Sequence, residues 1–122
     1  MKSDNITKDK SYAFALKIIK VHNFLSKEQH EFILSKQILR CGTAIGALVW
    51  EAEHAQSYAD FINKMNIALK EANETSYWLM LLKDSGYMDI GSYESLHHDC
   101  IELVRLLASI IKTSKANTKK TK

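Results

Sequence analysis

The chain has 122 residues, enough for one domain with a single buried core. It contains no proline, only four glycines and 46% hydrophobic residues, a composition that favours long helices over sheets joined by tight turns. The net charge of +3 is unevenly divided, because residues 1–40 carry +4, residues 41–111 carry −6 and residues 112–122 carry +5. The central part is therefore acidic, so affinity for nucleic acid has to come from the N-terminal helix, the C-terminal segment or the assembly of several chains.

The sequence has no features of a membrane or secreted protein. No run of about 18 apolar residues is present to span a bilayer, and residues 1–10 lack the apolar core of a signal peptide. Cys41 and Cys100 fall on apolar positions, without the spacing of a disulfide framework or a zinc site. We expect a cytoplasmic protein with no membrane partner, no metal and no cofactor.

The first two helices are indicated by apolar periodicity and one capping motif. Residues 1–10 are polar and mixed in charge, so a flexible N-terminus is expected there. A first helix is predicted from about Ser11 to Leu25. Ser26 followed by Gln29 resembles a capping box, which predicts a second helix that continues to about His54.

Two further helices follow. Ser57 followed by Asp60 is a weaker cap, and it places a third helix from about Tyr58 to Ser85, before a glycine at position 86 that suits the left-handed end of a helix. Asp89, Gly91 and Ser92 predict a turn, with Ser92 as the cap of the fourth helix. The lysine-rich residues 112–122 have almost no apolar side chain and are expected to be disordered.

Each predicted helix has one apolar seam with alternating spacings of three and four. The inward positions are Phe14, Ile18, Val21 and Leu25; Leu34, Ile38, Cys41, Ile45, Leu48 and Ala52; Phe61, Met65, Ala68, Ala72, Thr75, Leu79 and Leu82; and Leu96, Cys100, Leu103, Leu107 and Ile110. Short connections between the helices predict an all-α fold, an up-down-up-down antiparallel four-helix bundle over residues 11–111.

The second helix also has apolar residues on its far side, where an isolated bundle would show charge to water. Gly42 and Gly46 each cost a helix interior about 1 kcal/mol relative to Ala, so a neighbouring backbone is expected close to them. We interpret this outer seam, with the second half of the third helix, as a subunit interface; scattered surface apolar residues are the alternative. The interface candidates are Leu39, Thr43, Gly46, Ala47, Trp50, Tyr77, Met80 and Leu81.

Two Glu-x-x-His motifs, at Glu51 and His54 and at Glu94 and His97, are similar to those of di-iron bundles. In the predicted topology they lie at opposite ends, roughly 30 Å apart at 1.5 Å per residue. One metal centre cannot use both, and no catalytic or phosphate-loop signature is present, so an enzyme is not expected.

Four aromatic residues raise the alternative of base stacking, as on single-strand platforms. Because acidic residues surround them, packing within or between subunits is favoured. The four are Trp50, Tyr58, Tyr77 and Trp78.

Four segments of the chain resemble a known family. They are FALKIIKVHNFL, LSKQILRCGTAIGALVWEA, SYADFINKMNIALKEANETSYWLMLLKDSGYM and LVRLLASIIKTSK. Together they resemble the four-helix-bundle family named for proteins encoded in intervening sequences of bacterial 23S ribosomal RNA genes, which is related to the accessory variability proteins of diversity-generating retroelements. The resemblance implies a small cytoplasmic bacterial protein, a homopentameric ring and a non-enzymatic role involving nucleic acid.

The chain departs from the family after Gln37, where Cys41, Ala44 and Leu48 replace usual polar residues; any role of those polar groups is not carried over. The leading hypothesis is a non-catalytic homo-oligomer that binds RNA or a ribonucleoprotein through basic patches. A protein interaction scaffold without nucleic-acid affinity is the alternative, and a metal enzyme ranks third. The nucleic-acid candidates are Lys112, Lys115, Lys119, Lys120 and Lys122 of the tail, and Lys17, Lys20, Lys36 and Arg40.

Overall fold

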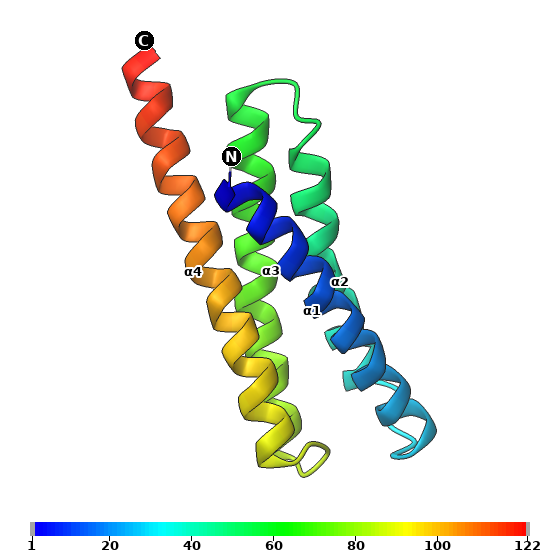
Figure 1. Cartoon of the computed structure of the whole chain (residues 1–122). Coiled ribbons are helices and arrows are strands. Elements are labelled where there is room, and N and C mark those ends of the chain that lie inside the picture. The colour runs from blue at the N-terminus through cyan, green and yellow to red at the C-terminus, as the bar shows by residue number, and fades with distance from the viewer. Residues whose placement is uncertain (1, 122) are drawn as a thin grey trace.

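Four helices in a row make up the fold, which is known from a computed structural model that describes residues 2–121 and the side chains of residues 5–118. They are α1 (Lys2–Lys27), α2 (Leu34–Ala52), α3 (Tyr58–Asp84) and α4 (Ile90–Thr121). Successive helices run in opposite directions (Figure 1). In the described part of the chain each helix packs on its neighbours in sequence, α1 also packs on α4, and the diagonal pairs meet only through side chains of the shared core. The predicted antiparallel four-helix bundle is confirmed.

The core contains most of the predicted inward residues. Phe14, Ile18 and Leu25 of α1 are buried, as are all five predicted residues of α4. In α2 the buried residue between Ile45 and Ala52 is Val49, whereas the predicted Leu48 is half-buried at the edge of the core. The buried residues Ile45, Val49 and Ala52 are therefore spaced by four residues and then by three, the reverse of the predicted order. The reason is that a straight helix drifts relative to a strict heptad repeat.

The N-terminal segment is helical, which corrects the flexible segment expected over residues 1–10 as far as residues 2–10 are concerned. Thr7 and Ser11 are fully buried in α1, and the Ser11 hydroxyl donates to the Lys8 carbonyl at 3.0 Å. Such back-bonding lets a small polar side chain face a core. Lys8 and Lys10 then form ion pairs with Glu53 at 2.9 Å and with Glu102 at 3.1 Å.

The first connection differs from the predicted capping box. Ser26 lies within α1, and its hydroxyl donates to the His22 carbonyl at 2.8 Å. The carboxylate of Glu31 instead accepts from the backbone amide of Ser35 at 2.8 Å and from that of Ile33 at 3.2 Å. Partial burial raises the pKa of Glu31, but these amides outweigh it and lower the pKa below its ordinary value. Glu31 therefore caps α2, which begins eight residues after Ser26.

The other helix ends are set by local side chains. Ser57 accepts from the amide of Asp60 at 3.1 Å, and Gly86 has a φ of 87°, so both predictions for α3 are confirmed. At the start of α4 the cap is Asp89 and not Ser92. The Asp89 carboxylate accepts from the Ser92 amide at 3.1 Å and from its hydroxyl at 2.7 Å, which lowers the pKa of Asp89.

The C-terminal segment continues α4 to Thr121, so the disorder expected over residues 112–122 is wrong for residues 112–121. Ile111 and Ser114 are buried on its inner side, and the Thr118 hydroxyl donates to the Ser114 carbonyl at 2.9 Å. Lysine and alanine are also good helix formers, so charge alone does not end the helix. Figure 1 shows this end of α4 at the same end of the bundle as the start of α1 and the α2–α3 connection.

Candidate nucleic-acid and oligomer surfaces

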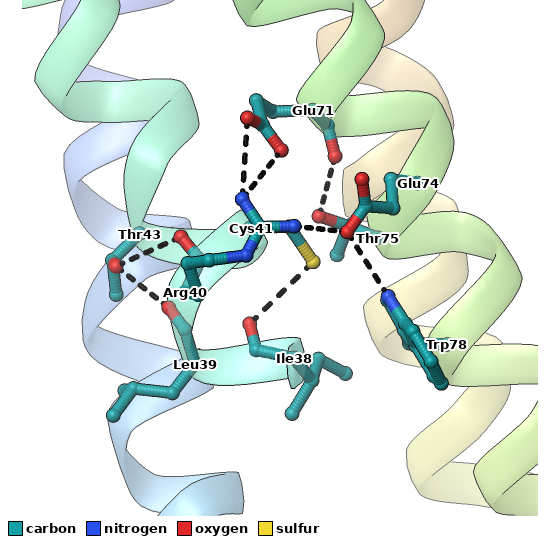
Figure 2. Close-up of polar contacts among 9 residues, drawn as sticks. All are labelled: Ile38, Leu39, Arg40, Cys41, Thr43, Glu71, Glu74, Thr75 and Trp78. Atoms are coloured by element: carbon teal, nitrogen blue, oxygen red, sulfur yellow. Dashed lines mark hydrogen bonds and ion pairs between the residues drawn. The ribbon is translucent and has the colours of Figure 1, made fainter. Parts of the chain in front are cut away.

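Arg40 is bound within the molecule. Its guanidinium donates to both carboxylate oxygens of Glu71 at 3.2 and 3.3 Å and also to Glu74, and Glu74 in turn accepts from the indole nitrogen of Trp78 at 3.2 Å (Figure 2). One arginine therefore faces two carboxylates across the α2–α3 contact. The charge of Arg40 is therefore already offset by two carboxylates, and its place among the nucleic-acid candidates stays a prediction.

The other predicted basic residues of the body fall into two groups. Lys17 of α1 is paired with Asp99 of α4 at 2.6 Å, so its charge is already balanced. Lys20 and Lys36 are exposed and form no ion pair with any described residue. These two remain available to an anion.

The C-terminal lysines lie on a helix. Lys112 and Lys115 are exposed on α4 and have no ion pair within the described part of the chain. Lys119 and Lys120 belong to the same helix, but their side chains lie outside the described residues, as does Lys122 altogether. The structure therefore brings Lys112 and Lys115 together as unpaired cations.

The two glycines of α2 face α1 of the same chain. A Cβ on Gly42 would lie 2.8 Å from Cγ1 of Ile18, and one on Gly46 would lie 3.3 Å from the carbonyl oxygen of Ser11. The expected close backbone is present at Gly46, where it belongs to α1 of the same chain, whereas the close neighbour of Gly42 is the Ile18 side chain. Gly46 therefore packs against α1 within the subunit, a role that was not predicted when it was assigned to a subunit interface.

An apolar surface nevertheless extends over α1 and α2. Tyr12, Leu16 and Ile19 of α1 are 65%, 48% and 42% exposed, and Trp50 of α2 is 56% exposed beside exposed Ala47. We call these five residues the α1–α2 stripe. A groove of about 760 Å³ lies at the Tyr12, Ala47 and Trp50 part of the stripe, with Thr43 and Gly46 also in its lining. The α1 half was missed, although the spacing of four and three from Tyr12 to Ile19 is the same pattern that marked α2.

The remaining interface candidates form a smaller surface. Tyr77 and Met80 are 53% and 45% exposed on α3, and Tyr77 packs edge-on to Trp78 with ring centroids 5.2 Å apart. Leu39 and Leu81 are half-buried, and Leu39 packs against the core. We call Tyr77 and Met80 the α3 patch, because they are the exposed members of this group.

The cysteines and the Glu-x-x-His motifs have the placement expected from sequence. Cys41 and Cys100 are buried, and burial raises the pKa of both thiols, that of Cys100 to about 12. Glu51 is in the last turn of α2 and Glu94 near the start of α4, which lie at opposite ends of the bundle (Figure 1). Among the described residues, no three His, Cys, Asp or Glu side chains are grouped to hold a metal ion. Within residues 2–121, no helix combines the length and apolar character needed to cross a membrane.

Comparison with known proteins decides the family. The 23S rRNA-intervening sequence protein family matches residues 3–109, nearly the whole bundle. The chain belongs to this family. A solved structure from Bacteroides thetaiotaomicron VPI-5482, described as a protein with unknown function from the S23 ribosomal protein family, is 59% identical, with a TM-score of 0.89 over 90% of this chain and 98% of that chain. No curated protein matches the chain. The family match ends before Lys112, so the unpaired lysines of α4 lie beyond it.

Proposed function

We propose that this chain is a non-catalytic homo-oligomer, with five subunits as the expected number, that binds RNA or a ribonucleoprotein in the cytoplasm. The main observation in support is that some basic side chains form ion pairs with carboxylates and others do not. Lys8, Lys10, Lys17 and Arg40 are each matched to a carboxylate. Lys112 and Lys115 are exposed one turn apart on α4 without one, whereas the other unpaired candidates, Lys20 and Lys36, lie on different helices. Unpaired lysines release counterions when they meet phosphates, so they supply most of the affinity for a polyanion.

Assembly is supported by the α1–α2 stripe and the α3 patch. They lie on different helices, so a contact between the stripe of one subunit and the patch of the next would be heterologous, and such contacts form a ring when the rotation between subunits closes. Burying the exposed half of each large side chain contributes on the order of 1 kcal/mol. Several must be covered together to exceed the cost of association. A ring would also gather several α4 ends.

The non-catalytic part of the proposal rests on the thiols. Cys100 donates to the Ala72 carbonyl at 3.2 Å, and burial raises its pKa far above neutrality, so no thiolate nucleophile is available there. The family description names 23S rRNA because its members are encoded in intervening sequences of 23S rRNA genes, so the choice of RNA as the polyanion rests on the unpaired lysines.

The second candidate is a protein interaction scaffold without affinity for nucleic acid. It is favoured by the same ion pairs, because they leave the surface of the body balanced or negative around Glu71 and Glu74. The scaffold would use the α1–α2 stripe alone and would not depend on Lys112 or Lys115.

A binding titration separates the two candidates. A short single-stranded RNA is titrated with the wild type and with the double variant Lys112→Gln, Lys115→Gln, at several salt concentrations. Each lost phosphate contact lowers the slope of log affinity against log salt by about 0.7, so the double variant is expected to lose about 1.4. The variant Lys27→Gln, Lys70→Gln removes the same charge from exposed positions elsewhere and should change little. No binding by the wild type at low salt would favour the scaffold.

A further inference from the structure

A cavity of about 680 Å³ opens at the end of the bundle where α1 begins and α4 ends (Figure 1). Each of the four helices contributes to its lining, through Asn5 of α1, Val49 of α2, Phe61 of α3 and Ser114 of α4. We call it the end cavity. Clefts between the helices of a bundle are common ligand sites.

The lining of the end cavity combines apolar and polar groups. Val49 and Met65 are buried and Phe61 is half-buried, so one part of the wall is the end of the hydrophobic core. Exposed Asn5 and His54 are at its edge. An amide offers donors and an acceptor, and an imidazole offers one or both, so these groups suit the edge of a flat nitrogen heterocycle.

The aromatic residues differ in their freedom to stack on a ring. Lys8 already covers one face of Trp50, with its amino nitrogen 4.3 Å from the ring centroid, and Trp78 is tied to Glu74. Tyr58 lines the end cavity and is 51% exposed. Two aromatic residues line the cavity, and Tyr58 is the more exposed of them, since Phe61 is half-buried against the core.

The charges around the end cavity suit a ligand attached to phosphates. Glu53 is the one carboxylate in the described lining, and its ion pair with Lys8 at 2.9 Å offsets its repulsion of an anion. Lys112 and Lys115 lie within two residues of Ser114 on α4; both are exposed and stand outside the lining, on the solvent side of that helix.

We infer that the end cavity receives an unpaired base of single-stranded RNA while Lys112 and Lys115 contact the adjoining phosphates. Recognition of RNA commonly splays a single-stranded base onto an aromatic side chain and binds its edge by hydrogen bonds. The inference rests on the proposed RNA binding. It adds where on the protein the RNA binds and which part of the RNA, an unpaired base, enters the cavity.

The test compares a short single-stranded RNA with an abasic strand of the same length. The abasic strand keeps the phosphates but has no bases, so it measures the lysine contacts alone. One base stacked and held in the cavity should make the wild type bind the intact strand roughly tenfold more tightly than the abasic strand. Equal binding of the two strands by the wild type would overturn the inference while leaving the proposed RNA binding intact. No binding of either strand at low salt would refute the proposed function itself.

Two neighbouring residues of α4 supply the variant and its control. Ser114→Leu puts a larger, apolar side chain into the wall of the end cavity, whereas Thr113→Leu places the same side chain on the exposed side of the helix. Ser114→Leu should reduce the preference for the intact strand and leave binding of the abasic strand unchanged, and Thr113→Leu should keep both. If Ser114→Leu does not fold, Tyr58→Leu at a half-exposed position provides a second test. It should also reduce the preference for the intact strand over the abasic strand. A folded Ser114→Leu or Tyr58→Leu protein with the full preference would contradict the inference.

Discussion

The substitution Gly42→Ala tests how closely α1 and α2 approach. Alanine in place of glycine inside a helix contributes about 1 kcal/mol of stability through propensity. Here the new Cβ would lie 2.8 and 2.9 Å from Cγ1 and Cγ2 of Ile18, a fully buried side chain. Because a β-branched side chain is restricted at χ1, relief requires the helices to shift, and overpacking costs about 1–3 kcal/mol. We expect Gly42→Ala to be neutral to destabilising by about 2 kcal/mol.

A double-mutant cycle makes this expectation sharp. Ile18→Ala creates a cavity and should cost about 2–5 kcal/mol. In that background the clash is gone, so Gly42→Ala should stabilise by about 1 kcal/mol, which reverses its sign. Urea denaturation followed by circular dichroism measures all four proteins. If Gly42→Ala stabilises the wild type by the full propensity term, space exists beside Gly42 and the described packing of α1 on α2 is refuted.

Three further predictions follow from the polar groups. Glu31→Ala should cost about 1 kcal/mol at neutral pH as a lost helix cap. Folding lowers the pKa of Glu31, so this stabilisation is present above the unfolded pKa and disappears as the pH falls through the folded pKa. The stabilities of wild type and variant should therefore converge as the pH is lowered. A difference in stability that stays constant with pH would contradict the cap. Cys41 and Cys100 should react with a thiol reagent only at the rate of unfolding, whereas fast labelling of the native protein would contradict their burial. Arg40→Met should destabilise by more than Lys64→Met, because it leaves Glu71, with a side chain 15% exposed, without its partner; equal losses in thermal denaturation would refute this.

The apolar pattern of the sequence predicted the fold well for a physical reason. Four seams with helical spacing and short connections leave few arrangements other than an antiparallel bundle, and Phe14, Ile38, Leu79 and Leu103 are buried as that argument requires. The same argument missed the helix over residues 2–10, since Thr7 there, and Ser11 at the predicted helix start, are polar by composition but buried in the structure. Hydrophobic periodicity does not detect an inward hydroxyl that bonds to its own helix.

The candidate surfaces were harder to predict because they depend on partners distant in the chain. Lys17 and Asp99 are 82 residues apart, and the two glutamates that bind Arg40 are on the next helix. Gly46 indicated a close neighbour correctly, but no local pattern tells whether that neighbour is the same chain or another. The cap of α2 was misassigned for a related reason, since Glu31 acts from outside the usual capping position.

The central claim is that several copies of this chain assemble through the α1–α2 stripe, and multi-angle light scattering tests it most directly. The full chain has a mass of 13.9 kDa, and at micromolar concentration we expect a particle of about five times that mass. Trp50→Glu should shift the mass toward that of one chain while circular dichroism shows unchanged helicity. Gln37→Glu makes the same change in charge at an exposed position of α2 and should leave the assembly intact. A wild type that scatters as a monomer, or a Trp50→Glu variant that assembles fully, would contradict the account.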